Sequence, residues 1–504
     1  MLTKSNYLVG LQCHKLLWIT KNDKERIPEP DKIAHANFKT GDLIGVLATK
    51  VFPDGVDLSN LKFQENIETT KDSLILRKPL FEAGFLVDDL YSRGDILLPV
   101  GKDEWDIIEV KSATKIKDIN LHDVAFQKYV YEKAGLKIRK CILMHVNNEY
   151  VRSGKIEPKE FFVQTDITEQ VEEYSLGIKE NIERMFEIIQ GSEPEFLIDD
   201  LLTIEYDNLC LDEFMDSLPE SNVFEMHRMF KKKKVELYKE GYIKMTDIPG
   251  SIKLNDKQKI QRRLAFSKEK NIDKPAIKNF LKKLEYPIYY LDFETINPAV
   301  PKFDGMKPYQ RIPFQFSLHI QDEPNGKLKH VSFLAEGIID SRPKFMQALK
   351  DNLKNRGSIL VYNQAFEKGV MNECSDALPE FKGWYEENIL PRILDLWDVF
   401  KDFSYYDPKQ RGSTSIKAIL PLFSDLSYSD IDINDGLSAS LEYERVTFGS
   451  NDDICSEETD KIDPKEIEGI IESERLKVRE ALEKYCKMDT MAEVEIVGGL
   501  GEIN

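Results

Sequence analysis

The chain has 504 residues, of which 41% are hydrophobic and 32% are charged; this supports packed cores in roughly three domains, or two with a connector, and excludes a disordered chain. It contains no run approaching the ~20 apolar residues of a transmembrane helix and no N-terminal secretory signal, so we expect a cytoplasmic protein that does not bind membranes. The formal net charge of −19 argues against a general nucleic-acid coat, but it is compatible with a nuclease, since metal sites are built from carboxylates.

Residues 1–190 predict an α/β core. A helical pattern holds Tyr7, Leu11 and Trp18 near the start. Four strand-like runs follow at 73–81, 84–91, 95–100 and 105–113, then a helical pattern at 122–134 and a further strand at 138–146. Strands in series, followed by a helix and another strand, are typical of an α/β domain.

The strand-like runs carry a first candidate site. Asp95 heads one run, and Glu109 and Lys111 lie two apart in the next, so that these two side chains project to one face. A hairpin would bring Asp95 beside them. Two carboxylates can hold Mg²⁺ or Mn²⁺, and a lysine can orient water or neutralise a phosphate oxygen. An exposed hairpin with alternating charges is the alternative explanation.

Arg93 and Gly94 precede the aspartate, and Gln127 and Tyr131 lie four apart on the following helical pattern. Together these residues resemble the PD-(D/E)XK nucleases of the RecB-like group, including its CRISPR-associated branch. The resemblance implies a restriction-endonuclease-like core in which Asp95 and Glu109 bind metal, Lys111 is catalytic, and Gln127 and Tyr131 face DNA.

Two features common in that group are incomplete in this sequence. The early helix that often carries a metal-binding His or Glu offers His35 in the stretch HANFKTGDLIGVLA. An iron–sulfur cluster would need four thiolates, whereas only Cys13 and Cys210 stand in matching regions. We therefore expect no iron–sulfur cluster. The other cysteines lack zinc-site spacing and are expected to be reduced, packed thiols: Cys141, Cys374, Cys455 and Cys486.

Residues 191–285 read as a basic helical connector. Between Phe224 and Leu284 there are 18 Lys and Arg against 7 Asp and Glu, a net charge of +11. The candidate nucleic-acid contacts are Lys231, Lys232, Lys233, Lys234, Arg262 and Arg263. Such a basic surface can guide a nucleic-acid strand. A solvated helical spacer is an equally weighted interpretation.

Residues 286–504 carry a second set of acids. Asp292 and Glu294 lie two apart in the β-forming run 288–296, Glu367 follows a second strand-like run at 358–366, and Asp489 lies on a helical pattern at 464–497. Buried carboxylates need compensation, which a metal ion provides. Two-metal phosphoryl transfer uses about four such ligands.

The order of these motifs resembles the DnaQ-like (DEDD) exonucleases, which have an RNase H-like fold with a mixed sheet flanked by helices. Tyr485, four residues before Asp489, matches the tyrosine (DEDDy) version, in which the tyrosine helps to position water. Glu367 stands where that family usually has Asp. By the same resemblance Asn363, Asp395 and Lys417 are secondary candidates.

The whole chain resembles bacterial proteins in which a RecB-like nuclease precedes an uncharacterised RNase H-like domain. We expect a two-site, metal-dependent nuclease with a 3'-5' exonuclease in residues 286–504, acting on DNA ends or single strands in repair or mobile-element defence. DNA is favoured over RNA as the partner, and the sequence indicates no protein partner. The alternative is a nucleic-acid-binding scaffold in which one or both sites are degenerate.

Overall fold

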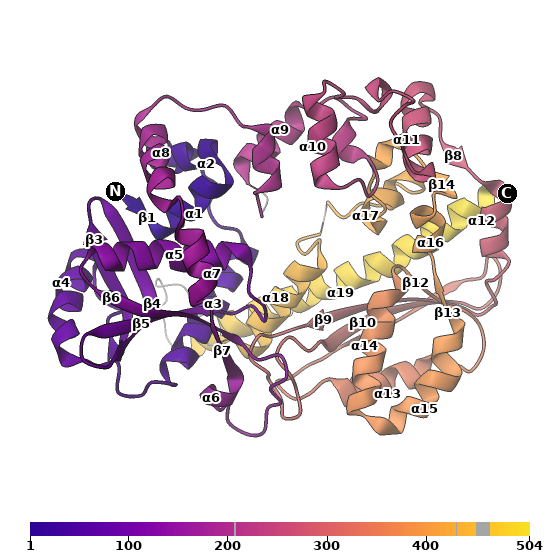
Figure 1. Cartoon of the computed structure of the whole chain (residues 1–504). Helices are drawn as coiled ribbons and strands as arrows, with labels where there is room; N and C mark the ends of the chain where they lie inside the picture. The colour runs from indigo at the N-terminus through magenta and orange to yellow at the C-terminus, as the bar shows by residue number, and fades with distance from the viewer. Residues whose placement is uncertain (206–207, 430, 450–463, 504) are drawn as a thin grey trace. The chain divides into compact units, whose positions relative to one another are not determined.

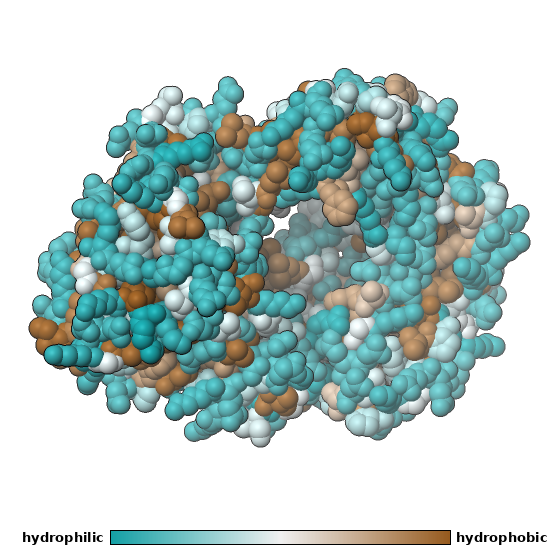
Figure 2. Space-filling view, in the orientation of Figure 1, coloured by the Kyte–Doolittle hydropathy of each residue, from teal (hydrophilic) through white to brown (hydrophobic). Residues whose placement is uncertain are grey.

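The computed structural model describes residues 1–205, 208–429, 431–449 and 464–503. It comprises two compact units: unit 1 is Met1–Leu218 with Ala299–Tyr309, and unit 2 is Pro219–Pro298 with Gln310–Asn504 (Figure 1). Both units combine helices with a mixed sheet, which confirms the predicted α/β class. Among the described residues no helix is long and apolar enough to cross a bilayer, and hydrophilic residues cover most of the face shown in Figure 2.

The sheet of unit 1 has the strand order β2-β3-β4-β5-β6-β7, with β1 paired in parallel to β4. Strands β3, β4 and β5 are antiparallel neighbours, whereas β5 and β6 run parallel. Helix α5 (Asp118–Lys133) makes the crossover that this parallel pair requires. The strands are β1 (Leu2–Thr3), β2 (Val56–Asp57), β3 (Leu80–Val87), β4 (Leu90–Val100), β5 (Glu104–Lys111), β6 (Lys137–Val146) and β7 (Phe162–Asp166).

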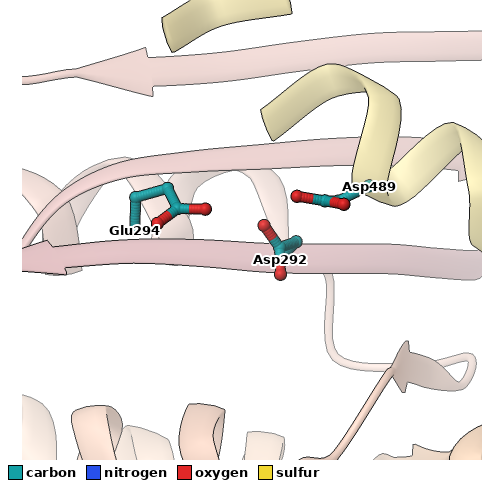
Figure 3. A group of neighbouring side chains, drawn as sticks. All are labelled: Asp292, Glu294 and Asp489. Carbon is teal, nitrogen blue, oxygen red and sulfur yellow. The ribbon is translucent and has the colours of Figure 1, made fainter. Parts of the chain in front are cut away.

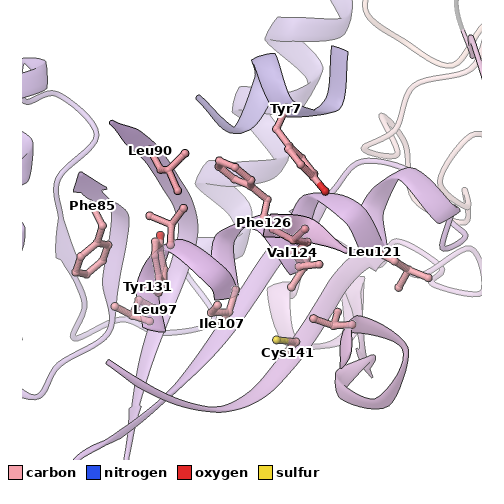
Figure 4. Close-up of a cluster of buried hydrophobic side chains, with 14 of the residues drawn as sticks. Tyr7, Phe85, Leu90, Leu97, Ile107, Leu121, Val124, Phe126, Tyr131 and Cys141 are labelled. Carbon is pink, nitrogen blue, oxygen red and sulfur yellow. The ribbon is translucent and has the colours of Figure 1, made fainter. Parts of the chain in front are cut away.

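The core of unit 1 lies between α5 and the sheet. Phe126 and Tyr131 of α5 pack near Leu97 and Ile107 of the strands, and Tyr7 stacks on Phe126 with ring centroids 4.7 Å apart (Figure 4). The other helices are α1 (Lys4–Gln12), α2 (His14–Asn22), α3 (Lys32–Thr49), α4 (Phe63–Ser73), α6 (Pro158–Phe161), α7 (Thr168–Ser175), α8 (Ile178–Gln190) and α9 (Leu209–Ser217).

Two of the predicted strands in unit 1 are wrong in their limits. The run 73–81 begins as a 3₁₀ turn, Leu74–Leu76, and Arg77 then adopts a left-handed backbone with φ 48°, so that β3 starts only at Leu80. The run 84–91 is divided by a hairpin turn in which Asp88 and Asp89 have φ values of 47° and 61°. Apolar runs alone did not reveal these turns.

The sheet of unit 2 has the order β11-β10-β9-β12-β13. Its central strand, β9 (Ile288–Ile296), matches the predicted run and pairs antiparallel with β10 and parallel with β12. The other strands are β10 (Ile312–Gln321), β11 (Leu328–Leu334), β12 (Ile359–Val361) and β13 (Ile393–Asp395), and β8 (Asn271–Ile272) pairs with β14 (Tyr405–Tyr406) outside this sheet.

The long helix α19 (Pro464–Glu502) packs on β9 and β10. It extends five residues beyond the predicted C-terminal end at residue 497. Helices α13 (Arg342–Asn352), α14 (Gln364–Ala377) and α18 (Gly436–Phe448) also contact the sheet. The remaining helices of unit 2 are α10 (Lys231–Lys239), α11 (Asp256–Ser267), α12 (Lys274–Leu281), α15 (Lys382–Trp384), α16 (Trp397–Lys401) and α17 (Ile416–Ile419).

The basic segment is not a free spacer. Residues 191–218 belong to unit 1, and 219–285 belong to unit 2. Ile277 and Phe280 of α12 are buried with Tyr290 of the central strand, and the Gln261 side chain donates a hydrogen bond to the Tyr406 hydroxyl at 3.0 Å. Residues 219–285 are therefore a packed part of unit 2.

Replacing Ile107 with Ala should lower the thermal transition of unit 1. The side chain is 1% exposed between the sheet and α5, so the substitution removes buried methyl groups and leaves a cavity, at a cost of about 2–5 kcal/mol. Ile75→Ala makes the same chemical change at a residue that is 85% exposed and should shift stability by less than about 0.5 kcal/mol. Equal effects of the two variants in calorimetry or urea unfolding would contradict this packing.

Candidate metal centres

The predicted hairpin in unit 1 brings Asp95 and Glu109 together. Strands β4 and β5 pair with Ile96 opposite Ile108, so Asp95 lies across from Glu109. The Val110 amide donates to Asp95 Oδ2 at 2.6 Å, which fixes that carboxylate at the strand junction. Lys111 shares the face of Glu109, and its Nζ lies 2.6 Å from Glu109 Oε1. All three predicted residues therefore meet.

Two further residues that the sequence did not reveal complete this cluster. Lys4, in the first turn of α1, places its Nζ 3.0 Å from Glu109 and 3.1 Å from Asp123 of α5. Lys111 bridges the same two carboxylates, at 2.6 Å and 2.7 Å. The spacing of Asp123, four residues before Gln127, could have placed it on the same helix face, whereas Lys4 carries no such signal.

The charges in this cluster set one another's ionisation. Burial opposes charge on Lys4 and Lys111, but the facing carboxylates outweigh burial and raise both pKa values. Burial, together with Asp123 and Asp95, raises the pKa of Glu109 to about 7. For Asp123 the two lysines overcome burial and lower the pKa. The site thus holds two permanent cations among its acids.

Gln127 and Tyr131 do not face DNA as predicted. Gln127 is completely buried, and its side-chain amide donates to Glu109 and, at 3.3 Å, to Asp123. Tyr131 is 1% exposed, and its hydroxyl donates to the Ala83 carbonyl at 2.9 Å. Gly94 is required opposite them, since a Cβ there would lie 2.5 Å from Gln127 Oε1. Both side chains support the site from inside the core.

A cavity of about 650 Å³ opens onto these carboxylates. Its walls include Asp95, Glu109 and Lys111, together with Glu82 of β3 and Asp42 of α3. His35, the residue expected from the early helix, is exposed and is absent from the lining. Asp42 lies in the same predicted stretch and is the acid that this helix offers to the cavity.

Cys13 and Cys210 lie together although nearly 200 residues separate them. The two buried thiols are within hydrogen-bonding reach, in an apolar cluster with Ile19 and Ile204. Cys13 also caps α2, where its sulfur accepts from the Leu16 amide at 3.4 Å. The described cysteines are free and buried, and Cys455 lies outside the described residues. The expectation about an iron–sulfur cluster stays a prediction.

In unit 2 the predicted acids from β9 and α19 converge. Asp292 and Glu294 project from one face of β9 toward Asp489 of α19, and one oxygen from each lies within 4.8 Å of the others (Figure 3). Asp292 keeps part of its surface exposed, whereas Glu294 and Asp489 are buried. Alternation along the strand and the packing of α19 across it together place three carboxylates around one point.

Four other side chains surround this triad. Tyr428, which the sequence analysis missed, donates to Asp489 Oδ1 at 2.6 Å, and Cys486 donates to Asp292 Oδ2 at 3.5 Å. Lys417, a secondary candidate, holds its Nζ 5.9 Å from the ring centroid of Tyr485. Tyr485 also hydrogen-bonds Asp489, as its position one turn away predicts.

The remaining predicted residues follow β12 and β13. Glu367 lies in the first turn of α14 and is 2% exposed, and its Oε2 has no hydrogen-bond partner within the described part of the chain. Asn363 precedes α14 in a left-handed conformation with φ 77°. Asp395 accepts backbone N–H groups from Asn363, Gln364 and Trp397 at 2.9, 3.1 and 3.0 Å, so its oxygens serve the turn that positions Glu367.

Burial dominates the ionisation of the triad. It raises the pKa of Asp489 to about 6, against the hydrogen bonds from the two tyrosines. Burial and neighbouring carboxylates raise the pKa values of Asp292 and Glu294 well above their usual range. The Lys417 charge opposes the shift of Glu294. Repelling acids that face one another in this way are a suitable ligand set for a divalent cation.

The six predicted basic contacts differ in their surroundings. Lys231 and Lys232 are exposed on α10, and Lys233 forms an ion pair with Glu236 at 3.2 Å. Three others are engaged within unit 2: Lys234 donates to the Phe224 carbonyl at 2.6 Å, Arg262 to the Ile248 carbonyl at 3.2 Å, and Arg263 to Asn271 at 2.7 Å.

Comparison with known proteins gives matches to part of the chain. Residues 289–415 match a family described as a domain of unknown function (DUF2779). The matched range includes Asp292, Glu294 and Glu367 but ends before Asp489. The uncharacterized MG366 homolog of Mycoplasma pneumoniae is 28% identical over 36% of this chain, and the uncharacterized protein UU173 of Ureaplasma parvum is 26% identical over 34%. The matches cover 29% and 28% of those proteins.

Without divalent cations, unit 2 should lose stability as the pH rises. The folded-state pKa of Asp489 is about 6, above the unfolded value of 3.8, so its stabilising contribution is complete below pH 3.8 and is lost as the pH passes 6. A divalent cation competes with these protons and should therefore raise the melting temperature more at pH 7.5 than at pH 5.

The measurement is melting temperature against pH in EDTA and in Mn²⁺. Asp292→Asn serves as the assignment control, because it removes a ligand with little change in shape and should reduce the Mn²⁺ effect. A shift with Mn²⁺ that is the same at both pH values, or the same in Asp292→Asn, would contradict this site.

Proposed function

We propose that this protein is a two-site, metal-dependent nuclease that hydrolyses phosphodiester bonds of DNA. The observation that carries the proposal is the convergence of Asp292, Glu294 and Asp489 within 4.8 Å. Among the described residues, Lys417 is the cation that acts on Glu294 and Asp489, and one positive charge does not balance three carboxylates, so the set suits Mg²⁺ or Mn²⁺. A bound divalent cation would activate water and stabilise charge on the scissile phosphate.

In unit 2 the tyrosines have a positioning role. Burial raises the pKa values of Tyr428 and Tyr485 above their ordinary range, so both stay protonated at neutral pH and cannot serve as bases. Both act as hydrogen-bond donors to Asp489, and the Tyr485 hydroxyl could turn from Asp489 to a water or a phosphate oxygen bound beside it. This fits the role that the DnaQ-like resemblance assigns to Tyr485.

In unit 1 the cavity beside Asp95 and Glu109 would admit a phosphodiester. Lys111 stays charged because its pKa is raised, so it contributes a positive charge toward phosphate and does not act as a base. Both Glu109 oxygens accept hydrogen bonds within the protein, from the two lysines and Gln127, and a metal would have to compete with these donors. This competition is the observation that favours the alternative function for unit 1, a degenerate site that binds nucleic acid without cleaving it.

Glu109→Gln and Asp292→Asn should each remove one cleavage activity. Loss of a metal ligand forfeits several kcal/mol of transition-state stabilisation, which corresponds to a rate reduction of roughly 100-fold or more. The assay uses end-labelled single- and double-stranded DNA and RNA with Mg²⁺ or Mn²⁺. Exposed Glu104→Gln on the strand of Glu109, and exposed Asp351→Asn on α13, are matched controls. If the wild-type protein leaves every substrate intact, the nuclease proposal is wrong.

Changing Lys231, Lys232 and Lys233 to Gln should weaken nucleic-acid binding and flatten its salt dependence. Each phosphate contact contributes about 0.9 to the slope of log K against log[salt] on duplex DNA, so three lost contacts would lower it by up to about 2.7. The exposed lysines 102, 155 and 159 of unit 1, changed to Gln, control for net charge. The slopes are measured by fluorescence anisotropy. Equal slopes for both triple variants would show that the lysines of α10 are solvated and do not contact nucleic acid.

A further inference from the structure

Glu493 is an acid that neither sequence motif includes. It lies on α19 one turn after Asp489 and is 1% exposed, and its Oε2 has no hydrogen-bond partner among the residues that the structure describes. Glu367 of α14 shares this state, since it is 2% exposed and also has an unpartnered Oε2. Burying a carboxylate without a partner is unfavourable, because the charged form loses its hydration and gains nothing in exchange. Two such groups near one site require an explanation.

The fold brings both glutamates to the side of Asp292. Cys486, Asp489 and Glu493 recur at helical spacing and so share one face of α19, and Cys486 touches Asp292 at 3.5 Å. Glu367 follows β12, which runs parallel to β9, so it emerges at the end of the sheet toward which β9 carries Asp292. Burial, followed by the charge of Asp292, raises the pKa values of Glu367 and of Glu493.

Charge balance indicates more than one cation. The five acids Asp292, Glu294, Glu367, Asp489 and Glu493 carry a formal charge of −5 when ionised. Lys417 acts on Glu294 and Asp489, and Arg311 acts on Glu367, which leaves −3, more than one divalent cation neutralises. The triad accounts for one cation, with oxygens within 4.8 Å of one another. Asp395 is not needed for the second, because its oxygens already accept three backbone N–H groups. The unpartnered oxygens of Glu367 and Glu493 remain as ligands.

We propose that Glu493 is a metal ligand, and that with Glu367 and Asp292 it holds a second divalent cation beside the one bound by Asp292, Glu294 and Asp489. Asp292 would then be shared by both cations. The catalytic meaning of this arrangement rests on the proposed nuclease function, since paired cations stabilise both the attacking and the leaving oxygen in phosphoryl transfer. The binding stoichiometry does not rest on it.

The test counts Mn²⁺ ions by the electron paramagnetic resonance signal of free Mn²⁺, in full-length protein carrying Glu109→Gln to remove the unit 1 site. This background should bind two Mn²⁺. Adding Glu493→Gln should leave one, or weaken the second at least 10-fold, while Glu495→Gln, a partly exposed glutamate two residues along α19, should leave two. Asp292→Asn should lose both. Circular dichroism and melting in EDTA verify folding.

A second variant keeps the result decisive. Glu367→Gln should reproduce the loss of the second Mn²⁺, and the double variant Glu367→Gln/Glu493→Gln should be no weaker than either alone, because both remove the same cation. Two Mn²⁺ with unchanged affinity in Glu493→Gln, or one Mn²⁺ in the background protein, would overturn the proposal. Two Glu493-dependent ions without cleavage of any nucleic acid would uphold Glu493 as a ligand and refute only the nuclease function.

Discussion

The structure depends on how it accommodates carboxylates that are withdrawn from water. In unit 1 the protein supplies its own cations, since Lys4 and Lys111 both bridge Glu109 and Asp123. In unit 2 the acids of β9 and α19 face one another with Lys417 as the positive charge acting on Glu294. The same problem thus has two solutions: the internal lysines of unit 1 and, as we propose, divalent cations from solution in unit 2.

Each solution follows from sheet topology. Antiparallel pairing of β4 and β5 sets two acids opposite each other at a strand junction, and α5 covers them with Asp123 and Gln127. In unit 2 the parallel neighbours β9 and β12 end at the same edge, so acids distant in sequence meet there. Helix α19 then adds acids at successive turns. The scaffold is rigid at both sites because these acids stand on strands and helices rather than on loops.

The sequence predicted the features that depend on local periodicity. The two-residue spacing of Asp292 and Glu294 in β9, and of Glu109 and Lys111 in β5, predicted that each pair of side chains lies on one face of its strand. Lys4 was not predictable, because it reaches Glu109 across 105 residues and nothing local marks it. The position of Glu493 was predictable in principle, because it follows Asp489 by the same four residues that separate Tyr485 from Asp489. The DnaQ-like motif, however, ends at Asp489. The left-handed backbone at Arg77 was not predicted, because the apolar residues around it resemble a strand.

Asp395 shows how indirectly a residue can matter in such a site. Its two oxygens gather three backbone N–H groups and so hold the turn from which α14 departs with Glu367. In a saturation mutagenesis screen scored by function, Asp395 would rank among the proposed metal ligands although its oxygens bind main-chain N–H groups. Its conservation in any set of homologues would therefore report on the geometry of a turn, and the number of invariant acids would overstate the size of the ligand set.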